Sequence, residues 1–231
     1  MRIEFKEREV KNLKDFCGWR IWEKPKSIHQ YAIGADVAEG VGGDASCAQV
    51  IDCETGKHIA SFWHNLIDTD NYAAELVKAG KWYNNAYINI ECNNHGAGVI
   101  ALMGASVRGL AYPNLYMRYS FDEYMQQQSK VIGFKTTQAT KPRLIENLKS
   151  ALRDGELTTH DKATIQELNT FVRDERTGRM GAQGSSKDDR VMSLALAWEQ
   201  CLQLIENQNT DSVEPSYQPK YDEMTGFPIE I

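Results

Sequence analysis

The sequence lacks the long hydrophobic runs that mark membrane proteins. No apolar stretch reaches the roughly 18–20 residues that a membrane-spanning helix needs, and the residues after Met1 (Arg-Ile-Glu-Phe-Lys-Glu) have no apolar core of a secretory signal. Cysteine is scarce as well: there are five, an odd number, with no C-x-x-C pair and no spacing typical of a disulfide framework. The sequence therefore predicts a protein without a membrane span, in a reducing, intracellular setting.

Two motifs that would indicate other chemistry are incomplete. Cys92 and His95 have the C-x-x-H spacing of half a zinc site, but no second Cys/His pair completes it. The phosphate-binding loop of ATPases, G-x-x-x-x-G-K-[ST], is absent, because the Gly-Lys pairs at Lys57 and Lys81 lack the upstream glycine. We therefore expect neither a zinc centre nor ATP hydrolysis from this chain.

The composition is that of a globular protein with an uneven distribution of charge. The 231 residues are 42% hydrophobic and 25% charged, and the net charge of −6 argues against a nucleic-acid binder. Residues 206–231, however, hold six acids and one base, a net charge of −5, whereas residues 108–153 hold eight bases and three acids, a net charge of +5. The average charge therefore hides a basic middle segment, which is either an ordinary solvated surface or a nucleic-acid-binding one.

The pattern of apolar and turn-forming residues predicts an α/β fold with a mixed sheet flanked by helices. Three strands joined by tight turns form an antiparallel meander, after which helices and strands alternate and a helix closes the domain, giving five or more strands in all. The expected strands are 31–36, 45–52, 58–64, 87–91 and 115–119, and the expected helices are 68–83, 96–107, 140–153, 164–174 and 188–206.

Residues 31–205 are expected to form one domain. Residues 1–30 are interpreted as a lead-in or linker, and the acidic residues 206–231 as a disordered tail. The polar segment 120–137 predicts a hairpin or an extended loop, and the glycine-rich segment 177–186 predicts a mobile loop. Further expectations are Asp68, Thr69 or Asp70 as the cap of the first helix, Thr140 as the cap of the third, and Trp19 and Trp22 packed on the main body.

Four acids stand where a carboxylate is unfavourable. Asp36 and Glu91 each end an apolar strand, and Asp188 and Asp189 begin an apolar helix. Each has an ordinary explanation: Asp36 can accept hydrogen bonds from the amides of the following glycine-rich turn, and the two helix acids can interact with the helix dipole. Together they indicate more, because the carboxyl ends of adjacent parallel strands meet at one edge of a sheet.

Carboxylates gathered at one point repel one another unless cations neutralise them. Oxygen ligands alone suit Mg²⁺ or Mn²⁺, and two such ions roughly 3.5–4 Å apart form a device that hydrolyses phosphodiesters. The four acids therefore predict a metal-dependent phosphodiesterase site, provided that the strands ending at Asp36 and Glu91 are neighbours and parallel.

Four segments, in this order, resemble the nuclease domain of the large terminase subunit of tailed bacteriophages. They are GADVAEGVGGD (34–44), INIECNNHG (88–96), GFKTTQATKPRLIENLKSAL (133–152) and KDDRVMSLALAW (187–198), and the resemblance spans residues 31–201. It implies an RNase H-like fold and an endonuclease that cuts concatemeric viral DNA during packaging with two Mg²⁺ or Mn²⁺ ions. Full-length large terminases also carry an ATPase, so we expect this chain to be the nuclease domain alone.

The resemblance also implies a role for each acid. Asp36 matches an aspartate that bridges both ions, Glu91 matches the acid of the fourth strand, and Asp188 and Asp189 match the paired acids of the last helix, with Asp189 slightly favoured as the ligand. Asp44 matches a recurring acid after the glycine-rich turn, or is a turn residue that caps the next strand. The expected products carry 5′-phosphate and 3′-hydroxyl ends.

DNA contacts are expected from the basic segment and from the neighbourhood of the acids, with low sequence specificity. Arg190 either contacts the scissile phosphate or forms an ion pair with a nearby acid. Asn93, Asn94 and His95 follow Glu91 and are expected to support the metal ligands or to contact a phosphate. For His95, the alternative is an ordinary solvent-exposed loop residue. The expected DNA-binding residues are Lys130, Lys135, Lys141, Arg143 and Arg190, and Arg173, Arg176, Arg179 and Lys187 border a loop that closes over DNA or gates the metals.

The resemblance further implies partners and a location. Double-stranded DNA, the terminase ATPase domain, the small terminase subunit and the portal are the expected partners, in the cytoplasm of the infected bacterial host at the procapsid portal. We expect no membrane association and a monomer in isolation. Two alternatives remain: a Holliday-junction resolvase or hybrid ribonuclease of the same fold, and a non-catalytic docking domain of a packaging motor.

Overall fold

The computed structural model describes residues 18–93, 95–104, 110–122, 127–173, 180–184 and 186–211. Most of the predicted lead-in (1–17) and of the predicted acidic tail (212–231) lies outside the described residues, as do Asn94, Arg176 and Arg179. The chain divides into two compact units, residues 1–201 and 202–231. The first unit contains the sheet and the residues discussed below.

Five strands form one mixed sheet in the order β1-β4-β3-β2-β5. Strands β2 (Tyr31–Asp36), β3 (Ser46–Asp52) and β4 (Lys57–His64) form an antiparallel meander, and β5 (Tyr87–Ile90) lies parallel to β2. The predicted meander followed by a parallel strand is thus confirmed. Strand β1 (Trp19–Ile21) pairs with β4, so the segment interpreted as a lead-in supplies an edge strand.

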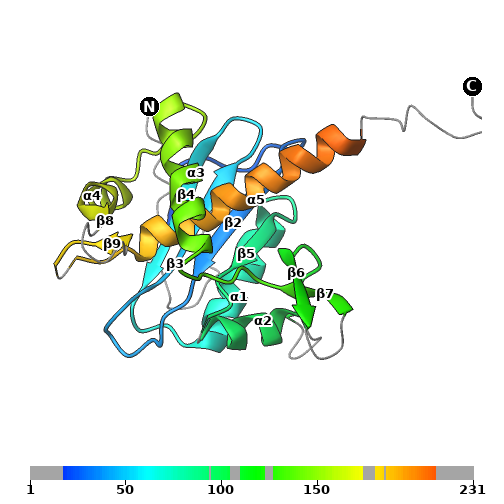
Figure 1. The fold of residues 1–231 in the computed structure, drawn as a ribbon, viewed down its shortest axis with the longest axis horizontal. Helices are drawn as coiled ribbons and strands as arrows, with labels where there is room; N and C mark the ends of the chain where they lie inside the picture. The colour runs from blue at the N-terminus through cyan, green and yellow to red at the C-terminus, as the bar shows by residue number, and fades with distance from the viewer. Residues whose placement is uncertain are drawn as a thin grey trace, which may run out of the picture. The chain divides into compact units, whose positions relative to one another are not determined.

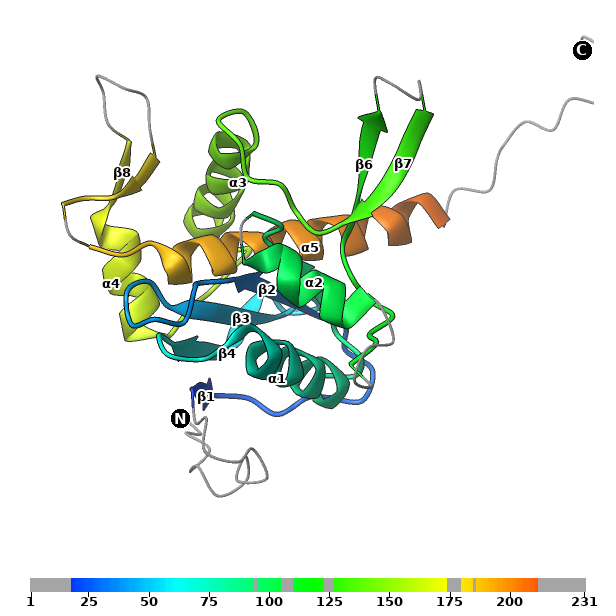
Figure 2. The same ribbon diagram turned by 90° about the horizontal axis from the view of Figure 1, so that it is seen from below.

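Helices cover both faces of this sheet. Figure 2 shows α1 (Thr69–Trp82) on one side of the strands and α5 (Asp189–Asp211) with α3 (Thr140–Asp154) on the other. The first five residues of β2 are buried, as expected for a strand covered on both faces. Two shorter helices, α2 (Gly96–Gly104) and α4 (Lys162–Thr170), follow β5 and α3 in the chain. Within the described residues, no helix is long and apolar enough to cross a membrane.

Helix α5 lies directly on β2, as Figure 1 shows. A Cβ atom at Gly34 would overlap the backbone of Ser193 and Ala197, so only glycine permits this approach. On the adjacent strand, the Asn89 amide Nδ2 donates to the Leu196 carbonyl at 3.0 Å. This contact sets the position of α5 relative to the strand ends, and therefore the position of the acids at its N-terminus.

Two hairpins project on the side of the sheet that carries α5 (Figure 2). The first, β6 (Met117–Asp122) with β7 (Gln127–Ile132), is the hairpin expected from the polar segment after residue 119. The predicted strand 115–119 was placed too early, because Leu115 only bridges to Ile88. The predicted helix 164–174 was too long: it ends at Thr170, and β8 (Phe171–Arg173) pairs with β9 (Met180–Ala182).

The predicted helix caps were right for one helix and wrong for another. The Asp68 side chain accepts a hydrogen bond from the Asn71 amide and caps α1. Thr140, by contrast, is already helical in α3, and its hydroxyl donates to the Lys135 carbonyl at 2.7 Å. The N-cap position belongs to Ala139, which forms no side-chain cap bond.

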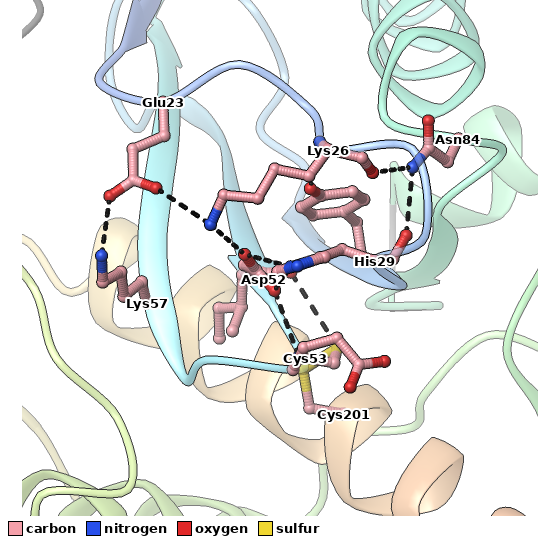
Figure 3. A network of polar contacts seen from close by, with 11 residues as sticks. Glu23, Lys26, His29, Asp52, Cys53, Lys57, Asn84 and Cys201 are labelled. Carbon is pink, nitrogen blue, oxygen red and sulfur yellow. Dashed lines mark hydrogen bonds and ion pairs between the residues drawn. A yellow bond between two sulfur atoms is a disulfide. The ribbon is translucent and has the colours of Figure 1, made fainter.

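The opposite end of the sheet is closed by a polar network and a disulfide (Figure 3). The buried Asp52 carboxylate accepts from His29 Nδ1 at 2.8 Å and pairs with Lys26. The next residue, Cys53, forms a disulfide with Cys201 of α5, whose Cα lies 5.5 Å away. The cysteine pattern did not predict this bond, because docking of α5 on the sheet is what brings together cysteines 148 residues apart.

Candidate active site

The first two acids lie side by side because their strands are parallel neighbours. Ala35 of β2 is in register with Ile90 of β5, and the Glu91 amide donates to the Ala35 carbonyl at 3.0 Å. Asp36 and Glu91 line the same cleft. Burial and the adjacent Glu91 raise the pKa of Asp36 well above its ordinary value, and the charges of Asp189 and Asp188 add to this effect. The predicted convergence of these two acids is confirmed.

Helix α5 brings Asp189 to the same place. The residue is 9% exposed, and its carboxylate accepts a hydrogen bond from the Ala45 amide at 3.1 Å. Burial raises the pKa of Asp189, and the Ala45 hydrogen bond opposes this shift. Asp36, Glu91 and Asp189 line one cleft of about 450 Å³, together with the glycine-rich turn and two residues that follow β5. The other lining residues are Val37, Ala38, Glu39, Gly40, Val41, Gly43, Asp44, Ala45, Asn93 and His95.

Asp188, the fourth acid, faces a lysine. Its Oδ2 lies 3.2 Å from the Lys141 ammonium in the first turn of α3. The same ammonium lies 5.7 Å from the centre of the Phe171 ring. The two neighbouring aspartates therefore have different environments: Asp189 turns into the cleft beside Ala45, and Asp188 turns towards α3.

A residue that the sequence did not indicate holds the N-terminus of α5. The Glu167 carboxylate of α4 accepts hydrogen bonds from the backbone amides of Arg190, at 2.9 Å, and Val191. Burial raises the pKa of Glu167 to about 7. Because Glu167 caps the helix, Asp188 and Asp189 need not do so. No local signal marks Glu167, since it lies in an ordinary polar helix and its partner is 23 residues away.

Arg190 forms ion pairs with nearby acids, which is the second of its two predicted roles. Its side chain is 11% exposed, and its guanidinium lies 3.2 Å from Glu167 and 3.8 Å from Asp161. It also lies 5.6 Å from the Trp63 ring. These contacts hold the guanidinium inside the protein, where it is paired with acids.

The other bases predicted to contact DNA differ in how freely they face solvent. Lys130 of β7 is exposed and lies 5.5 Å above the Tyr119 ring of β6. Lys135 is exposed after the same hairpin. Arg143 is more than half exposed but bonds the buried Glu199 carboxylate at 2.7 Å.

Three further predicted residues border the cleft. The Asn93 amide donates to Glu91 Oε1 at 3.0 Å and to the Thr136 carbonyl at 3.2 Å, so it orients Glu91. His95 lines the cleft and is exposed. Asp44 lines it too and forms an ion pair with Lys187, which joins the glycine-rich turn to the segment before α5.

The residues of the cleft fit a hard divalent cation. All the side-chain ligand atoms that Asp36, Glu91 and Asp189 offer are carboxylate oxygens. Burial and the neighbouring carboxylates raise the pKa of Asp36, so a cation bound here would stabilise its charged form. In the described part of the chain, no three His, Cys, Asp or Glu side chains are gathered closely enough to form a complete ion cage. Asp188 and Asp189 are instead engaged by Lys141 and the Ala45 amide.

Comparison with known proteins identifies the fold. Residues 33–201 match the terminase RNase H-like domain. The chain belongs to this family. The matched residues contain all four acids and begin and end within two residues of the segment in which the resemblance was recognised, so the predicted relationship and the RNase H-like fold are confirmed.

Relatives of the family come from thermophilic phages. The large terminase subunit of Thermus virus P23-45 is 29% identical over 177 residues, which cover 74% of this chain but only 32% of that protein. The chain therefore spans about a third of this relative's length. The large terminase nuclease of phage G20c with bound cobalt is 26% identical, with a TM-score of 0.60 over 79% of this chain and 87% of that one. The Thermus phage P74-26 large terminase nuclease domain has the same fold, with 24% identity and a TM-score of 0.61 over 87% of this chain and 90% of that one.

Proposed function

We propose that this chain is a metal-dependent endonuclease that hydrolyses DNA phosphodiester bonds and cuts concatemeric viral DNA during genome packaging. The observation that carries the proposal is the meeting of Asp36, Glu91 and Asp189 in one open cleft, at the ends of β2 and β5 and at the start of α5. Carboxylates from three elements far apart in the sequence share this cleft, and their charges disfavour one another unless a cation is bound.

The proposed ligands of two Mg²⁺ or Mn²⁺ ions are Asp36, Glu91, Asp188 and Asp189. A related nuclease has been crystallised with bound cobalt, which supports a divalent ion. When bound, such ions supply an acidified water molecule as nucleophile and a Lewis acid for the departing 3′-oxygen.

The protein's own groups prepare this site. Metal ions bind the ionised form of Asp36, which burial and the adjacent Glu91 disfavour in the metal-free protein. Asn93 holds Glu91 through one oxygen and leaves the other oxygen available. Glu167 fixes the start of α5 and with it the position of Asp189.

The proposed DNA path follows the exposed bases on the α5 side of the sheet. Lys130 and Lys135 are exposed on and after the β6–β7 hairpin, and Arg143 is partly exposed on α3. Lysines in these positions contact phosphates rather than base edges, so the proposed cleavage has low sequence specificity. The terminase ATPase domain, the small terminase subunit and the portal are the proposed partners, at the procapsid in the cytoplasm of the host.

The direct test is cleavage of supercoiled plasmid DNA in Mn²⁺ or Mg²⁺. Wild type should nick and linearise the plasmid, whereas Asp36→Asn and Glu91→Gln should lose at least about a hundredfold in rate. Asp154→Asn, an exposed acid at the end of α3, is the matched control and should cut like wild type. Cutting by Asp36→Asn at the wild-type rate would overturn the proposal.

The same assay separates the alternatives. A resolvase or hybrid ribonuclease should prefer four-way junctions or RNA–DNA hybrids to linear duplex. A non-catalytic docking domain should cut none of these substrates, and Mn²⁺ should not stabilise it in a way that Asp36→Asn removes.

A further inference from the structure

The charge distribution at the start of α3 is opposite to the usual one. Helix N-termini favour acids, because the helix dipole is positive there. The first turn of α3 has no acid, and it contains Lys141 and Arg143. Lys141 is also only 25% exposed, which is unusual for a lysine. A cation in this position is stabilised by something outside its own helix.

That stabilisation comes from Asp188 and Phe171. The ammonium lies 3.2 Å from the Asp188 carboxylate and 5.7 Å from the centre of the Phe171 ring, so α3, β8 and the segment before α5 meet at this one charge. Among the described residues, Lys141 is a base whose ammonium forms a direct ion pair with one of the four proposed ligands. Lys187 is nearby in sequence but pairs with Asp44 instead.

We infer that Lys141 is the internal counter-cation of Asp188 in the metal-free protein, so that metal binding has to displace it. The Lys141 ammonium neutralises the Asp188 charge at Oδ2 and repels a divalent ion that approaches the same carboxylate, so the two cations compete for Asp188. Once displaced, the ammonium stays tethered beside the site, where a DNA phosphate can take the place of Asp188 as its partner.

The inference rests on the proposed function, and calorimetric titration of the full chain with MnCl₂ tests it independently of cleavage. Lys141→Met keeps an apolar side chain of similar length and removes the charge. It should bind Mn²⁺ about three- to tenfold more tightly than wild type, because an internal competitor is lost. It should also cut DNA more slowly, because the phosphate partner is lost. A variant that is merely damaged would bind metal more weakly as well as cut more slowly.

Two controls separate this effect from general electrostatics. Lys149→Met removes an exposed positive charge from the same helix, where it pairs with Glu146 rather than with a cleft acid, and should change Mn²⁺ affinity by less than about twofold. In an Asp188→Asn background, the further change Lys141→Met should leave Mn²⁺ affinity unchanged. Lys141→Arg, which keeps the charge, should bind Mn²⁺ with about the wild-type affinity.

The outcomes are distinguishable. Unchanged or weaker Mn²⁺ binding by Lys141→Met, or an equal gain in the Asp188→Asn background, overturns the inference but leaves the proposed nuclease intact. If wild type itself binds no Mn²⁺, the proposed function fails and the inference with it. If Lys141→Met does not fold, the same comparison is made with Lys141→Gln.

Discussion

Asp36 and Glu91 lie at the adjacent ends of two parallel strands, where the Glu91 amide donates to the Ala35 carbonyl at 3.0 Å. Burial and the adjacent Glu91 raise the pKa of Asp36 well above its ordinary value, so the charged form of Asp36 is disfavoured in the metal-free protein. The negative charges of this pair disfavour each other until a cation binds between them. This relationship has a consequence for stability as well as for cleavage.

Replacing Asp36 by asparagine should stabilise the metal-free protein while abolishing its response to metal. The folded protein holds the Asp36 proton more tightly than the unfolded chain, so this group's contribution to stability decreases as the pH rises above its ordinary pKa. At pH 8 in EDTA, Asp36→Asn should therefore be more stable than wild type, because it removes a charge that burial and the adjacent Glu91 disfavour. Urea denaturation with and without Mn²⁺ measures both effects. A variant less stable than wild type in EDTA would contradict this account.

His58 should make the protein sensitive to mild acid. Burial lowers its pKa to about 4, and its neutral ring is already satisfied by the Ala60 carbonyl and the Thr159 hydroxyl. The unfolded chain binds this proton near pH 6.5, so stability decreases as the pH falls from 6.5 to 4, by up to about 3 kcal/mol. Unfolding free energies measured across this range should show the slope in wild type and a flatter one in His58→Gln. Parallel slopes would rule out His58 as the cause.

Removing the Glu167 carboxylate should loosen the start of α5. Glu167→Ala leaves the Arg190 and Val191 amides without their acceptor and should lower stability by about 1–2 kcal/mol. Cleavage should decrease as well, because Asp189 is the preceding residue. Glu167→Gln keeps an acceptor oxygen and should lose less of both. Thermal melts measure the stability of the two variants, and plasmid assays measure their cleavage rates. An alanine variant as stable as wild type would exclude the capping role.

Reductant should lower the melting temperature of this protein. The bond between Cys53 and Cys201 closes most of the domain into one loop, and bonds of this kind contribute about 2–4 kcal/mol. Cys201→Ser should melt like the reduced wild type, with or without dithiothreitol. The buried Cys47 is unbonded, so Cys47→Ala should keep the dependence on reductant. If dithiothreitol does not change the melting temperature of the wild-type protein, the disulfide does not form in solution.

Lys130 should contribute to DNA affinity through its charge alone. Lys130→Ala should weaken binding to duplexes of any sequence and reduce the magnitude of the salt dependence of log K by about one. Lys57→Ala is a suitable control, because Lys57 starts β4 at the sheet end opposite Asp36. Fluorescence anisotropy at several salt concentrations separates the two variants. If Lys130→Ala leaves the slope of log K against log salt concentration unchanged, Lys130 does not contact DNA.

The local structure followed from the sequence. The apolar runs that end at Asp36 and Glu91, the Asp68 cap of α1 and the hairpin after residue 119 all depend on residues close together in the chain. Turn chemistry and hydrophobic periodicity encode such features directly. Four short segments in order were also enough to recognise the family.

Only the tertiary structure decided how charges are paired. Lys141 with Asp188, Arg190 with Glu167 and Cys53 with Cys201 join residues far apart in the chain. Such pairs depend on where α3, α4 and α5 dock, and docking is set by packing, for example by the missing side chain at Gly34. The sequence by itself determined which acids stand at strand and helix ends, and long-range packing determined which of them face one another and which face a lysine.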